Sequence, residues 1–464
     1  MSSQPRFIFL ALATCWMALR VFGAQPCRIE VVERETDWPV PLVNLSTTHQ
    51  FHVITDNAGV AAIDAPELMD RDVFFHVASD GYEVPADGFG YRGVRLRPIA
   101  GQTLRVKVQR TMVARRLGRW TGAGLFAESQ RTGMDLDWKE SGVFGCDSVQ
   151  TTVHQGVRYW LWGDTTLPQY PLGLFDSLGA TSAVLPLSRF EPPLKAGFEF
   201  IRNRQGDLRG ITPMPGDGPT WATAMTSLPS DDATARLVCS YLKIRNHLEE
   251  YECGLGIWNP SDRKFDRWKM LWSKTASASK APVIPRGHAV PWKDPSGRDW
   301  MLFGNPFPTL RIPARFEAWQ DPSTWEVLHP QTELKDAATG EPVRPHSGGI
   351  GWHPWRKRWV TVFLQFGGKP SFLGELWYAE SDAPTGPWGP AVKVLTHRHY
   401  TFYNPCLHLD FTPANSPMLL FEGTYTREFS GNPSATPRYD YNQILYRLDL
   451  DDSRLKPAQS PSAF

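Results

Sequence analysis

The sequence predicts an all-β protein in which a small β-sandwich precedes a five-bladed β-propeller. Residues 27–110 contain short runs of alternating apolar and polar residues and no sustained 3.6-residue periodicity. After residue 141, a unit of strand, turn and aromatic-rich strand recurs along the chain. The chain has 464 residues, of which 41% are apolar and 21% charged, as is typical of a globular protein.

The N-terminus has the pattern of a secretory signal peptide. An apolar run over residues 7–19 follows Arg6, and Gly23 and Ala24 supply the small residues of a cleavage site. A membrane anchor needs about 20 apolar residues, and Arg20 interrupts this run. We therefore expect residues 1–24 to be removed, leaving a secreted or periplasmic chain with no membrane insertion.

The charge balance excludes one class of partner. Lys and Arg number 49 against 48 Asp and Glu, so no basic field is available to attract nucleic acid. The cysteines show no C-x-x-C or zinc spacing, and we expect neither a metal nor a cofactor. Cys239 and Cys253 flank the loop 245–248 symmetrically, which allows either a disulfide between them or two buried free thiols.

Residues 25–110 are expected to form the β-sandwich, because many short strands close most readily into two packed sheets. The early Pro39-Val40-Pro41, the turn at residues 55–60 and Gly81-Tyr82-Glu83 after an apolar strand resemble the carboxypeptidase-regulatory-like domain. That resemblance implies a scaffold or surface module. Residues 111–140 are expected to be a connector, and residues 453–464 a disordered tail.

The repeat defines the propeller, expected over residues 141–452. Each unit opens and closes on a polar residue, with offsets of 17, 18, 17, 19 and 18 residues in the pairs Asp147/Asp164, Thr223/Tyr241, His288/Asn305, His346/Gln365 and Asn404/Glu422. Five four-stranded units of this kind favour a closed propeller, whose blades hide their edges against one another. Two sandwiches with accidental similarity are the alternative.

The opening residues of the repeat predict a site. The first strand of each blade lines the central channel, so these residues meet at one mouth. If the first turn centres on Gln155, Asp147 lies opposite Gly163 and beside Asp164. Two converging carboxyl groups are what glycosidic bond cleavage requires, one as an acid and the other as a base or nucleophile.

The first blade also carries a family resemblance. Asp147-Ser148-Val149 followed by residues 156–165 (GVRYWLWGDT) resembles the opening blade of five-bladed propeller glycoside hydrolases, both family 43 arabinanases and xylosidases and a once uncharacterised family that includes D-arabinan hydrolases. The resemblance implies that Asp147 and Asp164 are the catalytic pair. A third acid, usually a glutamate of a middle blade, is replaced here by His288 and Asn305, which leaves Glu252 and Glu422 as candidates.

The remaining ring positions suit hydrogen bonding to sugar hydroxyls. The ring holds more imidazole and amide than carboxylate, so no metal is assigned to it. The expected substrate-binding residues are Arg286, His288, Asn305, His346, Gln365, Asn404 and Trp162.

We therefore expect a secreted glycoside hydrolase acting on a polysaccharide or oligosaccharide. A carbohydrate-binding propeller without catalysis is one alternative. A polysaccharide lyase, with His288 as its base and Arg286 neutralising a uronate, is another. The sequence indicates neither the sugar and linkage nor an oligomeric state.

Overall fold

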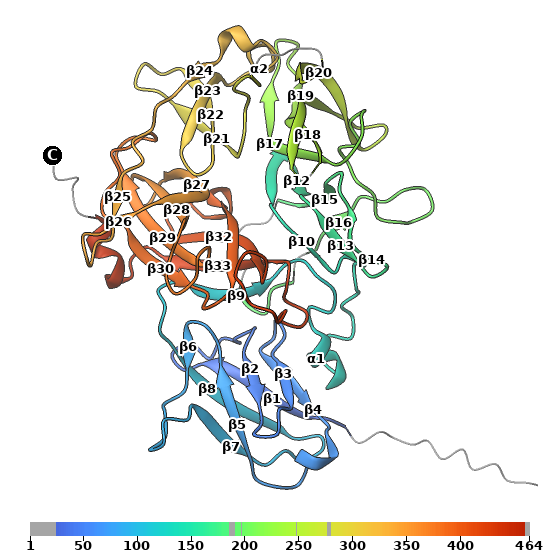
Figure 1. Cartoon of the computed structure of the whole chain (residues 1–464), viewed down its shortest axis with the longest axis vertical. Helices are drawn as coiled ribbons and strands as arrows, with labels where there is room; N and C mark the ends of the chain where they lie inside the picture. The colour runs from blue at the N-terminus through green and yellow to red at the C-terminus, as the bar shows by residue number, and fades with distance from the viewer. Residues whose placement is uncertain (1–24, 185–190, 196, 247, 276–279, 460–464) are drawn as a thin grey trace, which may run out of the picture.

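The computed structural model describes residues 25–184, 191–195, 197–246, 248–275 and 280–459, so the expected signal peptide lies outside the described residues. Within them the chain is all-β. Figure 1 shows a small N-terminal domain below a larger ring of sheets. The described helices are short: α1 (Ala127–Arg131), α2 (Phe316–Trp319) and the 3-10 turns η1 (Pro66–Leu68), η3 (Pro322–Thr324), η4 (Leu409–Phe411) and η5 (Ser453–Gln459).

The N-terminal domain consists of two four-stranded sheets. One has the order β4-β1-β8-β6, formed by Val60–Ile63, Cys27–Glu33, Thr103–Arg110 and Tyr82–Glu83. The other has the order β3-β2-β5-β7, formed by His52–Ile54, Asn44–Ser46, Val73–Ala78 and Gly93–Leu96. Ile29 of the first sheet and Phe75 of the second belong to one buried core, which gives the expected sandwich. The carboxypeptidase-regulatory-like assignment stays a prediction.

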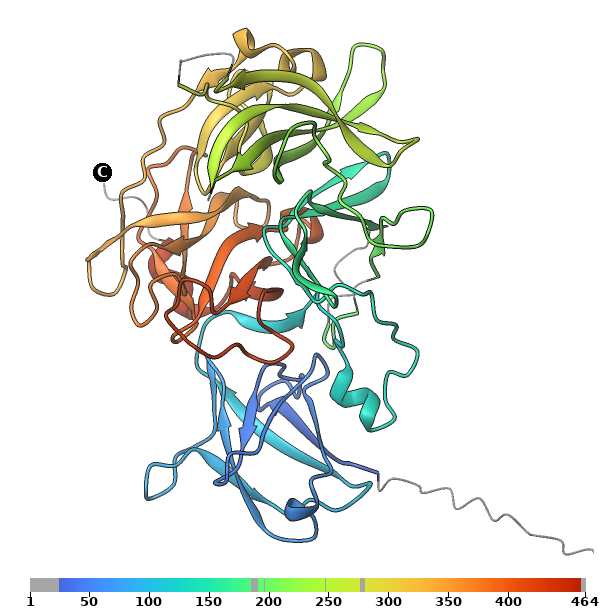
Figure 2. The same ribbon diagram turned by 45° about the vertical axis from the view of Figure 1, so that its right-hand side comes forward.

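Five four-stranded sheets follow as the blades of the propeller, which Figure 2 shows from another side. Blade 1 comprises β11 (Gln150–His154), β12 (Val157–Trp162), β15 (Leu178–Ala183) and β16 (Glu199–Phe200). Blade 2 comprises β17 (Thr220–Pro229), β18 (Ala235–Arg245), β19 (Glu249–Asn259) and β20 (Lys264–Ser273). Blade 3 comprises β21 (His288–Lys293), β22 (Asp299–Gly304), β23 (Pro308–Pro313) and β24 (Glu326–Val327).

Blade 4 comprises β27 (Pro345–His353), β28 (Arg358–Gln365), β29 (Glu375–Ser381) and β30 (Val392–Thr396). Blade 5 comprises β31 (Thr401–Leu407), β32 (Met418–Thr426), β33 (Asn442–Asp449) and β9 (Arg115–Arg119). Two small sheets sit beside the blades, formed by β10 (Gly145–Cys146), β13 (Thr165–Leu167) and β14 (Tyr170–Leu174) and by β25 (Leu334–Lys335) and β26 (Pro342–Val343). Every repeat unit expected from the sequence is the first hairpin of a blade.

Two expected boundaries are wrong. Strand β9 lies inside the segment 111–140 expected to be a connector, yet it pairs with β33 as the outer strand of blade 5. It therefore closes the ring with an N-terminal strand, which removes an edge of the last sheet. Residues 453–459 of the expected tail form η5, whose Leu455 is fully buried. Burial of that side chain is what orders the segment.

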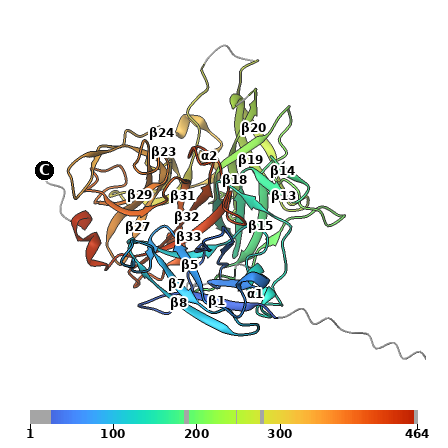
Figure 3. The same cartoon turned by 60° about the horizontal axis from the view of Figure 1, so that its bottom comes forward.

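The two domains share a core. Buried side chains of the sandwich and of blades 4 and 5 form one apolar cluster. Figure 3 shows the N-terminal strands in front of β31–β33. Arg116 of β9 is 1% exposed and donates to Pro41 and Asp80 of the sandwich and to the Tyr446 hydroxyl of blade 5, at 3.1, 2.8 and 3.0 Å. The sandwich is thus bonded to the strand that closes the propeller.

The described cysteines are buried free thiols. Cys239 pairs with Gly256 across β18 and β19, whereas Cys253 pairs with Leu242. Because each cysteine faces another residue, the two do not form the disulfide that the sequence allowed. Among the described residues, no helix combines the length and apolar character needed to cross a membrane.

Candidate active site

The first hairpin of blade 1 brings Asp147 and Asp164 face to face. Its turn is Gln155-Gly156, with φ of 50° and 79°, the backbone that a tight two-residue hairpin needs. Asp147 donates its backbone N–H to the Asp164 carbonyl at 3.2 Å and accepts from the Gly163 N–H at 2.8 Å. The side chains of directly facing residues start about 5 Å apart, so the two carboxyl groups share one small volume.

Gly163 makes room for this arrangement. A Cβ atom at position 163 would lie 2.1 Å from Oδ1 of Asp147, closer than any real contact. The Asp147 carboxyl group therefore lies over the backbone of the strand that carries Asp164. In the Trp-Gly-Asp-Thr sequence, the glycine is required by the neighbouring carboxylate rather than by a turn.

Blade 5 supplies two hydroxyl donors to Asp147. The Tyr403 hydroxyl donates to Oδ2 at 2.6 Å, and the Tyr441 side chain also hydrogen bonds to this carboxyl group. Burial raises the pKa of Asp147, while both tyrosines act in the opposite sense because they stabilise the carboxylate. The Ser148 side chain and the Asp164 backbone also hydrogen bond to this half-buried carboxyl group.

Asp164 is in a different environment. Burial, and next the charge of Asp147, raise the pKa of Asp164 to about 7, while a hydrogen bond from Trp221 lowers it. Its Oδ1 atom is buried and has no hydrogen-bond partner among the described residues. A carboxyl group that has one donor and faces a second negative charge retains its proton near neutral pH. Burial raises the pKa of both aspartates, but in the described part of the chain the hydroxyl donors that stabilise the carboxylate of Asp147 are absent from Asp164, whose pKa the charge of Asp147 raises further.

His288 lies at the start of the inner strand of blade 3. Burial, and next the nearby His408, lower the pKa of His288 to about 4, and its ring hydrogen bonds to the Pro405 carbonyl. The imidazole is therefore neutral at physiological pH, and one of its nitrogens is already engaged. It is suited to hydrogen bonding with a sugar hydroxyl and not to charge pairing.

Several residues expected to bind substrate instead join neighbouring strands and blades. Asn305 accepts from the Gly348 N–H of blade 4 at 2.7 Å, and Asn404 donates to the Ser148 hydroxyl of blade 1 at 2.7 Å. Gln365 accepts from the Trp377 indole at 2.9 Å within blade 4. Asn305 and Asn404 therefore join neighbouring blades, and Gln365 joins two strands of one blade. His346 is exposed and stacks on Phe366 at 5.9 Å.

Neither candidate for the third acid contacts the aspartate pair. Glu422 is 1% exposed and bonded to Nε2 of His408, itself fully buried, at 2.6 Å. Glu252 accepts from the Tyr241 hydroxyl at 2.8 Å and forms an ion pair with Arg267. Both carboxylates are committed to interior partners, because a buried charge is stable only when it is paired.

Arg286 and Trp162 are also engaged by other residues of the protein. Arg286 makes a two-pronged ion pair with Glu250, both contacts at 2.7 Å, so it offers no free cation to a uronate or sulfate. Trp162 is 1% exposed and stacks on Trp160 at 5.8 Å with nearly parallel rings. It is a core residue of blade 1, and the expectation that it binds sugar is wrong.

Three important residues were not assigned to the site from the sequence: Tyr403, Tyr441 and Trp221. Tyr403 adjoins Asn404, which the repeat singles out, so the repeat alone could have suggested it. Trp221 lies at the start of β17, the inner strand of blade 2. Among the described residues, no group of three or more His, Cys, Asp and Glu side chains is arranged to hold a metal ion.

No family model matches the chain, and no curated protein matches it. Among solved structures it is similar to an exo-1,5-α-L-arabinanase from a bovine ruminal metagenomic library, at 11% identity over 67% of this chain and 94% of that one, with a TM-score of 0.38. It is also similar to a Bacillus subtilis arabinanase, at 10% identity over 65% of this chain and 93% of that one, with a TM-score of 0.35. A third similar structure is an exo-β-1,3-galactanase from Phanerochaete chrysosporium. It is 10% identical over 72% of this chain and 64% of that one, with a TM-score of 0.38. The five-bladed fold of this chain rests on its own strand pairing.

Proposed function

We propose that this chain is a glycoside hydrolase that cleaves a polysaccharide or oligosaccharide at the mouth of the propeller. The observation that carries the proposal is the facing pair Asp147 and Asp164, of which Asp147 accepts from tyrosine hydroxyl groups while Asp164 is buried beside the charge of Asp147. Different environments within one pair of carboxyl groups are what assign acid and base roles in glycosidases.

The hydrogen-bond donors around each aspartate suggest which one acts as the acid and which as the base or nucleophile. Asp164, with a pKa of about 7, carries the proton and delivers it to the leaving glycosidic oxygen. Asp147, held by the hydroxyl groups of Tyr403 and Tyr441, is ionised and either attacks the anomeric carbon or takes a proton from the attacking water. Proton transfer from Asp164 leaves it ionised, so the acid must be reprotonated before the next turnover.

An exposed aromatic ring borders this pair. Phe429 is 72% exposed and meets Tyr403 edge to face, with ring centroids 6.2 Å apart. An apolar ring that remains open to solvent beside a catalytic carboxylate provides a flat surface for the C–H face of a sugar. We infer that Phe429 contributes to substrate binding in place of Trp162.

The proposed compartment is outside the cytoplasm. Its support is the sequence pattern of residues 1–24, which lie outside the described residues. A polymeric sugar substrate agrees with export, since polysaccharides too large to enter cells must be cut outside them. Cleavage near Ala24, read by N-terminal sequencing of the exported chain, is the expected result.

The test of the proposed function is a panel of polysaccharides with product analysis. Wild-type protein is incubated with arabinan, D-arabinan, arabinogalactan, β-1,3-galactan and arabinoxylan, beside Asp147→Asn and Asp164→Asn. We expect one polymer to be shortened, and each variant to lose at least about 100-fold in rate while it still melts cooperatively. Asp299→Asn is the matched control, because Asp299 is 68% exposed and distant from the pair in sequence.

Three results would overturn the proposal. Full activity in either aspartate variant would remove the pair from catalysis. Binding of a polymer without any cleavage would leave a carbohydrate-binding propeller. An unsaturated product would identify a lyase instead, although the ion pair of Arg286 with Glu250 speaks against that chemistry.

A further inference from the structure

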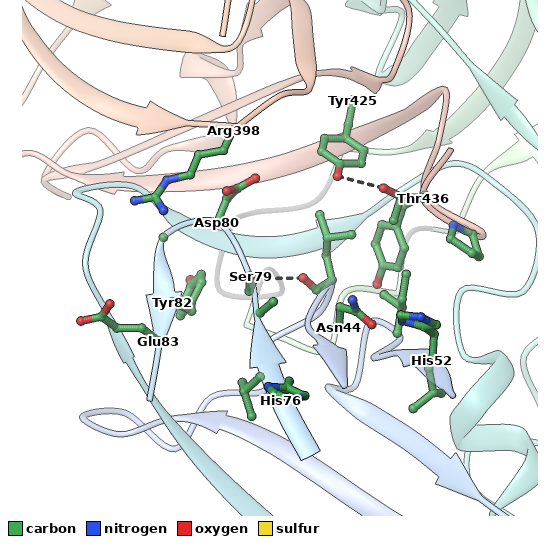
Figure 4. Close-up of a pocket in the computed structure, with 18 of the residues that line it drawn as sticks. Asn44, His52, His76, Ser79, Asp80, Tyr82, Glu83, Arg398, Tyr425 and Thr436 are labelled. Carbon is green, nitrogen blue, oxygen red and sulfur yellow. Dashed lines mark hydrogen bonds between the residues drawn. The ribbon is translucent and has the colours of Figure 1, made fainter. Parts of the chain in front are cut away.

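A cavity of about 1490 Å³ lies between the sandwich and the propeller, and neither aspartate of the pair lines it. Figure 4 shows side chains of the sandwich, Asn44, His52 and His76 among them, below the space, with Tyr425 and Thr436 of blade 5 above it. Pockets for single small ligands have volumes of about 300–1,000 Å³, so this cavity accommodates a longer molecule.

The cavity wall contains polar atoms without partners. Arg119 is 1% exposed, and its Nε and Nη1 atoms have no hydrogen-bond partner among the described residues. Oδ1 of Asn44 is likewise buried and unpaired there. One group needs an acceptor and the other a donor. A hydroxyl group supplies both, whereas an anion supplies acceptors only.

The wall contains acidic and basic side chains in nearly equal number. The acids are Asp56, Asp64, Asp80, Glu83 and Glu128, and the bases are Arg92, Arg119, Arg131, Lys393, Arg398 and Arg438. Arg92 pairs with Glu83 at 3.1 Å, and Arg131 pairs with Asp64 at 2.8 Å. Arg438 pairs with Glu128 at 2.5 Å. Since the acids nearly balance the bases and these three arginines are already paired, the cavity has no strong basic field for a polyanion. A neutral, hydroxyl-rich ligand fits the wall better than a nucleic acid or a sulfated chain.

An exposed ring completes the site. Tyr91 lines the cavity, is 57% exposed, and meets His76 edge to face with centroids 5.8 Å apart. The remaining face of such a ring is a stacking surface for a sugar. We propose that the cavity is a second saccharide site, which binds a neutral stretch of the polymer that the propeller mouth cleaves. The choice of polymer, and only that, rests on the proposed function.

The chain itself links the two sites. Residues 434–439, between β32 and β33, line the cavity, and Tyr439 donates to the Thr55 carbonyl of the sandwich at 2.7 Å. Tyr441, two residues further on, hydrogen bonds to Asp147. Two residues span at most about 7 Å of backbone, so the cavity wall ends close to the catalytic carboxylate.

The test is native-gel affinity electrophoresis through the five polymers of the panel, with Asp147→Asn as the parent so that the gel is not digested. Tyr91→Ala and Asn44→Ala are compared with Phe89→Ala, a matched control two residues from Tyr91 that is 90% exposed and outside the cavity. We expect the parent to be retarded by one polymer. The two cavity variants should lose about fivefold in affinity, while the control stays unchanged.

The outcomes separate the two proposals. Equal retardation of both cavity variants and the parent overturns the second site, as does a lack of retardation by every polymer. Retardation that depends on Tyr91 and Asn44, in a protein whose wild type cleaves nothing, supports the second site and ends the proposed hydrolase. In the active background, the cavity variants should keep the wild-type kcat on the shortest oligosaccharide that is cleaved.

Discussion

The Tyr403 hydroxyl lies 2.6 Å from Oδ2 of Asp147, although 256 residues separate the two in sequence. Closure of the ring by β9 and β33 sets blade 5 beside blade 1, and this contact crosses that junction. The ionisation of the proposed catalytic base therefore depends on the closing of the propeller.

Replacing Tyr403 tests this dependence. The tyrosine stabilises the carboxylate, so its O–H group lowers the pKa of Asp147, and Tyr403→Phe should raise that pKa. The acidic limb of the kcat/KM profile should then move to higher pH, with about a tenfold loss of rate below neutrality. Tyr170→Phe, at a residue 64% exposed, is the control. An unmoved acidic limb would contradict the assignment of Asp147 as base.

The raised pKa of Asp164 has a consequence for stability. Its folded pKa, about 7, lies above the ordinary value of 3.8, so between those limits the native state binds more protons than the unfolded chain. The free energy of unfolding from this group therefore falls as pH rises from about 4 to about 7, and stays low above it. The activity that depends on the protonated form should also decline above about 7.

Asp164→Asn removes that titration, since the amide stays neutral. We expect the variant to melt higher than wild type at pH 8 and to match it more closely at pH 4, while its activity is lost. Calorimetry at the two pH values measures the difference. Equal melting temperatures of the two proteins at pH 8 would show that Asp164 is not strained by burial and by Asp147.

Gly163 gives a variant that leaves both carboxyl groups in the chain. Its φ is outside the left-handed region, so alanine is tolerated by the backbone, but the new Cβ would collide with Oδ1 of Asp147. Gly163→Ala should lower kcat by at least about 100-fold and leave secondary structure intact. Gly88→Ala, where a Cβ meets nothing within 4 Å, is the control. Wild-type kcat would mean that the Asp147 carboxyl group need not lie over this strand.

The repeat of polar and aromatic residues was sufficient to predict five blades and the first hairpin of each. Hairpin pairing is local, but the turn is Gln155-Gly156 and not centred on Gln155, so the register is one residue from the expected one and sets Asp147 opposite Asp164. What the sequence could not show is which side chains meet across blades. Tyr403 reaches Asp147, and Asn404 reaches Ser148, only because the ring closes. Period-two patterns carry no information about such neighbours.

The third acid was mispredicted for a similar reason. Glu422 occupies the same repeat position as Asp164, and repeat position alone cannot distinguish a carboxylate at the mouth from a buried one. Cys406 faces Glu422 across the hairpin, and His408 holds its carboxylate at 2.6 Å. The burial of β9 was missed because its Arg-rich sequence resembles a connector, yet Arg116 is stabilised by carbonyl and hydroxyl acceptors.

The role of Glu422 can be separated from catalysis. Glu422→Gln replaces one oxygen by an amide group and removes the carboxylate that bonds to the buried His408. We expect a lower melting temperature, because removal of one partner from a buried pair costs about 3–5 kcal/mol, with both limbs of the pH–rate profile unmoved. A shifted limb with unchanged stability would restore Glu422 as a catalytic residue.

Arg116 holds the sandwich to the propeller, and its replacement tests whether the two domains unfold together. Arg116→Met keeps much of the side-chain volume but leaves the Pro41 and Asp80 carbonyls and the Tyr446 hydroxyl without this donor. Unsatisfied buried groups of this kind cost about 1–3 kcal/mol each, so the melting temperature should fall by several degrees. Arg97→Met, at an exposed arginine of the sandwich, is the control.

Because the domains share one core, wild type should show a single calorimetric transition. Two transitions in wild type, with only one of them lowered by Arg116→Met, would mean that the sandwich folds independently of the propeller.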